Sequence, residues 1–231
     1  MSDVENKIFD SYAEEYDSLQ KKNLGVLGKD LTVFSQYKIK TVKRIIQNQP
    51  KTFLEFGCGI GRNIPFIQEF FPETQITACD VSQKSLTIAQ KTNSDVNFFL
   101  IEKHGDIKSA INDLDCILVS GVMHHIKPTE HKEWLEELVA VLGEKGEIFI
   151  FEHNPYNPLT RHFFNTCPYD ADAALIKPAY CENLLSKCGI RSCRRQYTLF
   201  FPWRSPFWEN LEWFLGWCPL GGQYCVHGSK A

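Results

Sequence analysis

Residues 52–62, with the sequence TFLEFGCGIGR, combine a short apolar run with an acid and three glycines at alternate positions. Glycine has no Cβ, so Gly57, Gly59 and Gly61 can adopt positive φ and let a ligand approach the main chain closely. An apolar helical pattern begins directly afterwards, and the first N–H groups of a helix lack partners within it. We therefore expect a strand, a ligand-binding loop and a helix. Glu55, two residues before the first glycine, would repel a pyrophosphate and favours a cationic ligand.

Polar residues also end the other predicted strands. Asp80 closes the strand expected over 75–79 and lies 23 residues after Gly57. Glu102, Ser120 and Glu152 lie at or near three further strand ends. Ligands of open α/β sheets bind beyond the carboxyl ends of the strands, so these side chains are candidates for one site.

Strand and helix patterns alternate along the chain, which predicts a doubly wound α/β sheet whose parallel strands need helical crossovers. Ser82 is placed to cap a helix that runs to Lys91, and Gly143 with Gly146 indicates a turn. Residues 154–178 carry four prolines and are expected to form a wall or lid over the site. The strands are expected over 52–56, 75–79, 96–101, 115–120, 148–151, 192–201 and 223–227. The main helices are expected over 8–19, from a cap at Asp30 to 46, and over 64–71, 82–91, 135–142, 180–187 and 207–217.

Length and charge narrow the class of protein. A chain of 231 residues suits a single domain, with helices in 1–50, a ligand-binding core in 51–153 and acceptor-side loops and a sheet edge in 154–231. The net charge of -3 disfavours a nucleic-acid-binding surface. We expect a cytoplasmic protein, because no apolar run is long enough to span a membrane, no signal core is present and the cysteines are odd in number. No metal is indicated, since Cys188 and Cys193 have no histidine nearby.

The glycine pattern resembles a known motif. Glu55 followed by glycines 57, 59 and 61 is similar to motif I of the class I S-adenosylmethionine-dependent methyltransferases, and differs in spacing from the Gly-x-Gly-x-x-Gly of dinucleotide folds. The segment 119–126, VSGVMHHI, resembles the family's stretch after its fourth strand. Residues 9–17 and 141–148 are also similar to family segments. The resemblance implies a Rossmann-like methyltransferase fold with a mostly parallel seven-stranded sheet, N-terminal helices and a C-terminal antiparallel strand.

The same resemblance implies S-adenosylmethionine as cofactor and assigns residues to it. Asp80 corresponds to the family's ribose-binding acid, and a carboxylate there can accept both ribose hydroxyls. For the adenine contact two candidates remain open: Glu102, which is in register when counted back from Asp115, and Asp106 of the Gly-Asp pair. The residues expected to contact the cofactor are Tyr16, Glu55, Gly57, Cys58, Gly59, Gly61, Asp80, Val81, Glu102, Ser120 and Gly121.

The acceptor cannot be read from the sequence. The resemblance implies methyl transfer to a small-molecule or lipid-linked acceptor, with His125, His124 and Glu152 as catalytic candidates and His153 as a further possible base. A packing or loop-shaping role for the two adjacent histidines competes with catalysis. Alternative functions are a noncatalytic cofactor-binding or partner-binding module and, with less support from the glycine spacing, a nucleotide-dependent oxidoreductase.

Overall fold

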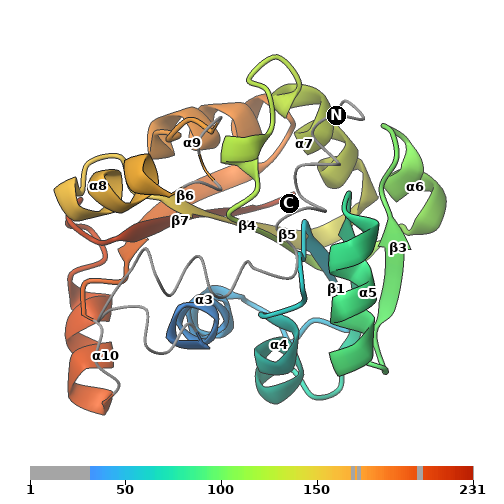
Figure 1. The fold of residues 1–231 in the computed structure, drawn as a ribbon, viewed down its shortest axis with the longest axis horizontal. Helices are drawn as coiled ribbons and strands as arrows, with labels where there is room; N and C mark the ends of the chain where they lie inside the picture. Colours follow the sequence, from blue (N-terminus) through green and yellow to red (C-terminus); the bar gives the residue numbers. More distant parts are fainter. Residues whose placement is uncertain (1–31, 168–169, 171–172, 202–204, 231) are drawn as a thin grey trace.

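The computed structural model describes residues 32–167, 170, 173–201 and 205–230, and these form a twisted sheet with helices on both faces (Figure 1). The described strands make one seven-stranded sheet in the order β3-β2-β1-β4-β5-β7-β6. Strand β7 runs antiparallel to both of its neighbours, and the pairs among β1 to β5 are parallel. The strands are β1 (Thr52–Phe56), β2 (Gln75–Asp80), β3 (Asn97–Leu100), β4 (Leu114–Ser120), β5 (Leu142–His153), β6 (Arg191–Thr198) and β7 (Gln223–Ser229).

Two groups of helices cover the two faces of the sheet. One face packs against α3 (Thr32–Ile45), α4 (Ile64–Phe70) and α5 (Gln83–Thr92). The opposite face packs against α6 (Asp106–Ala110), α7 (His131–Val141) and α9 (Pro178–Lys187). Two more helices, α8 (Pro158–Thr166) and α10 (Pro206–Phe214), lie on the side of the sheet formed by β6 and β7 (Figure 1).

The alternation of side chains along buried strands explains this layering. Phe53 of β1 belongs to the core under α3 and α4, while its neighbour Leu54 belongs to the core under α7. Ile117 and Leu118 of β4 divide between the two cores in the same way. Because each strand must be apolar on both sides, its sequence reads as a continuous apolar run.

The predicted fold class is confirmed. The described strands form the predicted mostly parallel seven-stranded sheet with an antiparallel C-terminal strand. Ser82 caps α5 as predicted, its hydroxyl oxygen accepting a 3.1 Å hydrogen bond from the main-chain N–H of Ser85. The helix expected over 8–19 and the cap at Asp30 lie outside the described residues.

Other boundaries differ from the prediction. The turn expected at Gly143 and Gly146 was wrong, because both glycines lie within β5. The pairing of β4 with β5 shifts register there, from Leu114 opposite Leu142 to Cys116 opposite Glu147, so the extra residues bulge without ending the strand. Helices α6 and α8 were not predicted, since both are short and α8 lies in a proline-bearing segment. None of the described helices has the length and apolar character needed to cross a lipid bilayer.

Candidate functional site

A cavity of about 460 Å³ opens at the carboxyl ends of β1, β2 and β4. Its wall is built from α3, the loop after β1, the ends of these strands and α8. The cavity therefore lies where the strand order reverses on either side of β1, which is the ligand position expected for this kind of sheet. Of the predicted residues, its wall contains Glu55, Gly57, Cys58, Gly59, Asp80, Val81, Ser120, Gly121, His124 and His125.

The three glycines of the loop all adopt positive φ, of +70°, +54° and +80° at Gly57, Gly59 and Gly61. A Cβ on Gly57 would overlap the side chain of Val122, so glycine is required there for packing as well as for backbone geometry. Gly61 has a different role, because it packs against Ala89 of α5 and does not line the cavity. The first two glycines thus expose main chain to the cavity, and the third lets α5 approach closely.

Asp80 fixes the shape of this loop. One carboxylate oxygen, Oδ2, accepts a 2.7 Å hydrogen bond from the N–H of Gly59, and the other, Oδ1, accepts a 2.9 Å bond from the N–H of Ser82. The side chain is 9% exposed and lines the cavity. Each carboxylate oxygen has more than one lone pair, so Asp80 can still accept hydrogen bonds from a ligand.

A buried acid, Glu55, and a half-buried amine, Lys38, also line the cavity. Glu55 accepts a 2.6 Å hydrogen bond from Asn63 through Oε1, whereas its Oε2 has no hydrogen-bond partner among the described residues. Burial raises the pKa of Glu55 to about 7, although Asn63 and Lys38 act to lower it. Lys38 of α3 donates a 2.7 Å hydrogen bond to the hydroxyl oxygen of Ser120, and burial lowers its pKa to about 8.

Lys38 was not among the predicted site residues. It lies on the inward stripe of α3 with Ser35, Ile39 and Val42, which are all buried. A lysine within such a stripe departs from the amphipathic pattern, and that departure is the sequence signal that could have identified it.

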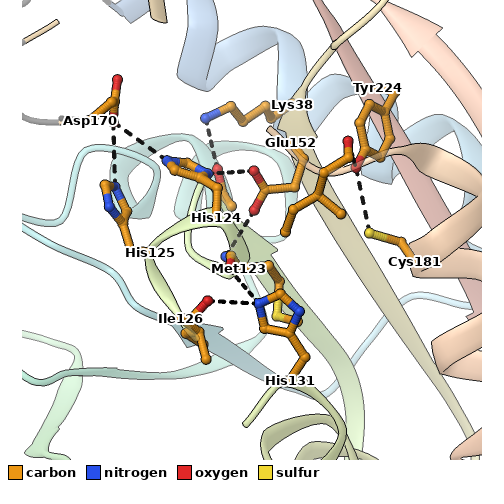
Figure 2. Close-up of polar contacts among 12 residues, drawn as sticks. Lys38, Met123, His124, His125, Ile126, His131, Glu152, Asp170, Cys181 and Tyr224 are labelled. Atoms are coloured by element: carbon orange, nitrogen blue, oxygen red, sulfur yellow. Dashed lines mark hydrogen bonds and ion pairs between the residues drawn. The ribbon is translucent and has the colours of Figure 1, made fainter. Parts of the chain in front are cut away.

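The second part of the cavity contains a cluster of histidines and carboxylates, which Figure 2 shows. The ring of His124 lies between two acids: Nδ1 is 2.5 Å from Oε2 of Glu152, and Nε2 is 3.6 Å from Oδ1 of Asp170. Nε2 of His125 is also 3.6 Å from Asp170 Oδ1. Glu152 itself is buried behind His124, where its Oε1 accepts a 2.8 Å bond from the N–H of Met123.

The three histidines of the cluster have different pKa values. Burial opposes a charge on His124, but Glu152 and Asp170 outweigh it and raise the pKa of His124 to about 10. Burial, together with the charge on His124, lowers the pKa of His125 to about 3 and that of His153 to about 4. At neutral pH His124 is therefore an imidazolium, whereas His125 and His153 are neutral imidazoles.

Local structure holds the histidine pair in place. Residues Met123–His125 form a short 3₁₀ turn directly after β4. Nε2 of His131 lies 2.9 Å from the carbonyl oxygens of both Met123 and Ile126, so the first turn of α7 braces the segment from below (Figure 2). The two histidines thus project from a fixed turn.

The two candidates for the adenine contact lie outside the cavity wall. Glu102 is exposed, and Asp106 accepts hydrogen bonds of 2.9 and 3.0 Å from the N–H groups of Glu102 and Lys103, which fixes the turn after β3. From this region Ile101 lines the cavity. Tyr16 lies outside the described residues.

The sequence of the core matches a known family. Residues 54–148 match the family described as Methyltransferase domain. Over these residues the chain is similar to the class I S-adenosylmethionine-dependent methyltransferases, whose cofactor is S-adenosylmethionine, and its sheet has the fold of that class.

Individual proteins share these features. The demethylmenaquinone methyltransferase of Thermotoga maritima is 27% identical over 157 residues, which cover 68% of this chain and 64% of that protein. The chain thus matches less than two thirds of that relative's length. A SAM dependent methyltransferase from Archaeoglobus fulgidus has a TM-score of 0.69 and 15% identity, covering 93% of this chain and 99% of the other. The plantazolicin methyltransferase BpumL, solved in complex with SAH, has a TM-score of 0.66 and 19% identity, covering 99% and 96%.

The residues present fit this cofactor. S-adenosylmethionine carries an ammonium group, and the buried Oε2 of Glu55 is an acceptor that the described protein residues leave unsatisfied. The absence of a side chain at Gly59 leaves room for a ligand against the main chain. Asp80 lines the same cavity with a carboxylate, a group that can accept hydrogen bonds from hydroxyl groups.

Proposed function

We propose that the protein transfers the methyl group of S-adenosylmethionine to a small-molecule acceptor. The observation that carries this proposal is that one cavity contains both the glycine loop with Asp80 and the cluster of His124 and His125. When bound, the cofactor supplies a methyl group on a sulfonium that is already an activated leaving group. The protein's main task is then to hold the acceptor in line with that methyl group, and such positioning can supply a large part of the catalysis.

The cofactor half of the cavity is charged at one end. We assign Oε2 of Glu55 to the ammonium of the cofactor's amino-acid end and the Lys38 ammonium to its carboxylate. The two side chains have opposite charges and both line the cavity, so together they complement a zwitterion. We assign Asp80 to the ribose hydroxyls, as the resemblance implies, while it keeps its bonds to Gly59 and Ser82.

The acceptor half is lined by aromatic rings and by the cluster of histidines and carboxylates. Phe163 and Phe164 of α8 line it together with His124, His125 and His153. We infer an acceptor with an apolar ring or chain and an ionisable hydroxyl, because aromatic side chains line this half and a histidine beside a carboxylate can accept a hydroxyl proton. We assign His125, whose Nε2 lies 3.6 Å from Oδ1 of Asp170, as the proton acceptor, and Glu152 as the residue that positions His124.

The relative from Thermotoga maritima supports an acceptor of this type, since it is named for demethylmenaquinone. A free small molecule and a lipid-linked one both remain within the proposal. We place the protein in the cytoplasm, because its nine cysteines are all free thiols in the structure, as is usual in a reducing compartment.

The proposal is tested in two steps. Calorimetry with S-adenosylhomocysteine should show one bound molecule per chain, and a folded protein that does not bind it would overturn the proposal. Transfer of a labelled methyl group should then be screened over demethylmenaquinone, its reduced form, and metabolite, lipid and RNA fractions. Binding without transfer to any of them would favour a noncatalytic cofactor-binding module.

A further inference from the structure

The cluster at the acceptor end of the cavity has the composition of a metal site. His124, His125 and Asp170 each place one donor atom so that the three atoms lie within 4.8 Å of one another. We propose that these residues bind a divalent first-row transition-metal ion, for which Zn²⁺ is a suitable probe. Two imidazoles and one carboxylate are a donor set that zinc and ferrous iron accept.

The distances favour a shared ion over direct hydrogen bonds. Oδ1 of Asp170 is 3.6 Å from Nε2 of both His124 and His125, beyond the usual range for an N–H···O hydrogen bond. Two ligands bound at ~2.0–2.2 Å to one tetrahedral zinc ion lie roughly 3.4 Å apart. The two distances to Asp170 therefore match the spacing of ligands around a common centre, and Figure 2 shows both histidine rings turned toward Asp170.

A contact on the side of His124 away from Asp170 fixes the orientation of the His124 ring. Glu152 lies 2.5 Å from Nδ1 of His124, which makes Nδ1 the protonated nitrogen and turns Nε2 toward Asp170. Glu152 is itself held by the N–H of Met123 at 2.8 Å. A carboxylate on the outer nitrogen of a ligating histidine is the usual support of a metal site. The two carboxylates, Asp170 and Glu152, would also balance the charge of a divalent ion.

The position of the cluster suggests what the ion would do. All three ligands line the cavity that contains the glycine loop, so a three-ligand ion would have an open position facing the acceptor. This part of the inference rests on the proposed function and selects acceptors whose reacting oxygen can bind a metal. The hydroxyl proton passes to solvent as the metal lowers its pKa. An oxygen–methyl bond then forms while the sulfur–methyl bond breaks, and the sulfur keeps the electron pair. When the metal ion is bound, His125 is one of its ligands and no protein base is needed.

Metal binding is tested without any acceptor. Untagged full-length protein is treated with a chelator, dialysed and titrated with Zn²⁺ against a chromophoric competitor, with Co²⁺ absorption as a second readout of nitrogen ligands. We expect one ion per chain, a loss of at least about 100-fold in affinity in Asp170→Ala and His125→Ala, and about 10–100-fold in Glu152→Gln. His162→Ala, which removes an exposed histidine of α8, is the matched control and should bind as the wild type does.

Circular dichroism and thermal unfolding show whether each variant is folded. No stoichiometric binding to the wild type, or equal affinity in Asp170→Ala and His125→Ala, would overturn the metal site. Either outcome leaves methyl transfer intact if S-adenosylhomocysteine still binds. Conversely, Zn²⁺ bound by this cluster without any binding of S-adenosylhomocysteine would support the metal site and refute the proposed function.

Discussion

The ammonium group of Lys38 donates a 2.7 Å hydrogen bond to the hydroxyl oxygen of Ser120, which joins α3 to the end of β4 across the cofactor cavity. Glu55 on β1 raises the pKa of Lys38 while burial lowers it, so the acid and the amine interact within one site. The glycine motif thus supplies the negative charge, and a helix that precedes it in the chain supplies the positive one.

If Lys38 binds the carboxylate of the cofactor, Lys38→Met should weaken binding of S-adenosylhomocysteine by ~1.5–3 kcal/mol, the range for hydrogen bonds to charged groups. Lys40→Met is the matched control, because Lys40 is in the same helix but pairs with Glu209 at 2.6 Å. Calorimetry measures the affinity of both variants for S-adenosylhomocysteine. Equal losses in the two variants would assign the effect to α3 as a whole.

Cofactor affinity should depend on pH through Glu55. Below its pKa of about 7 the carboxylate is protonated and must ionise to pair with an ammonium, so affinity should fall by up to about tenfold per pH unit below pH 7. Above pH 8 Lys38 loses its proton, and affinity should fall again. Calorimetry from pH 5.5 to 9 measures the profile.

Glu55→Gln is the control for the acid side of that profile. This variant should bind S-adenosylhomocysteine weakly, and its affinity should not fall further below pH 7. Because burial raises the pKa of Glu55, the ionised form is unfavourable in the fold, and stability is lost as pH rises through about 7. Without ligand, the variant should therefore unfold at a higher temperature than the wild type at pH 8. An acid limb that persists in Glu55→Gln would assign the titration to another group.

Asp80→Ala should weaken cofactor binding by ~1.5–3 kcal/mol through loss of the ribose hydrogen bonds. Asp115→Ala provides the comparison, since Asp115 accepts bonds from Lys51 and Thr52 at the opposite end of β1 and does not line the cavity. Calorimetry with S-adenosylhomocysteine separates the two. Wild-type affinity in Asp80→Ala would remove Asp80 from the site.

The sequence predicted the features of the fold and site that depend on local residue patterns. Apolar runs between glycines and prolines located the strands, and Ser82 was recognisable as a helix cap because its preference is local. The strand ends then indicated Glu55, Asp80 and Ser120 as candidates, because carboxyl ends of parallel strands meet at one edge.

The remainder of the site depends on contacts between distant segments. Asp170 is distant from His124 and His125 in the sequence, and only the fold brings them close together. It follows α8, a helix that was not predicted. The expectation of no metal rested on cysteine spacing and could not include this cluster. Lys38 is separated by 82 residues from Ser120, and no local pattern encodes that contact.

Glu152→Gln should uncouple His124 from its buried partner. The glutamine can still accept the N–H of Met123 but carries no charge, and removing one member of a buried ion pair costs up to about 3–5 kcal/mol. The pKa of His124 is raised to about 10, so this stabilisation is fully present below about pH 6.5 and is lost as pH rises through 10. Denaturant unfolding of chelator-treated protein should therefore show a larger wild-type advantage at pH 6.5 than at pH 10.

A surface pair on α7 provides the comparison for this effect. Glu136→Gln removes the exposed partner of Lys132 and should leave the free energy of unfolding unchanged at both pH values. The coupling of Glu152 to His124 would be refuted by a wild-type advantage over Glu152→Gln that is the same at pH 6.5 and pH 10.

Two glycine substitutions should separate packing from cofactor binding. Gly57→Ala adds a methyl group that overlaps Val122 at a φ of +70°, so overpacking of ~1–3 kcal/mol adds to a backbone cost of ~1–2 kcal/mol. Gly59→Ala at a φ of +54° has no heavy atom within 4 Å of the new methyl group, so only the backbone cost applies. Urea unfolding should therefore show the larger loss of stability for Gly57→Ala.

Cofactor binding should rank the two substitutions in the opposite order among folded proteins. The methyl group of Gly59→Ala meets no protein atom and lies on a loop that lines the cavity, so it should block the approach of the ligand to the main chain. Val122→Ala should cost less stability when added to Gly57→Ala than when added to Gly59→Ala, because only the first substitution clashes with Val122. Calorimetry and urea unfolding on the four variants measure both effects. Wild-type affinity in Gly59→Ala would show that the ligand does not approach this part of the loop.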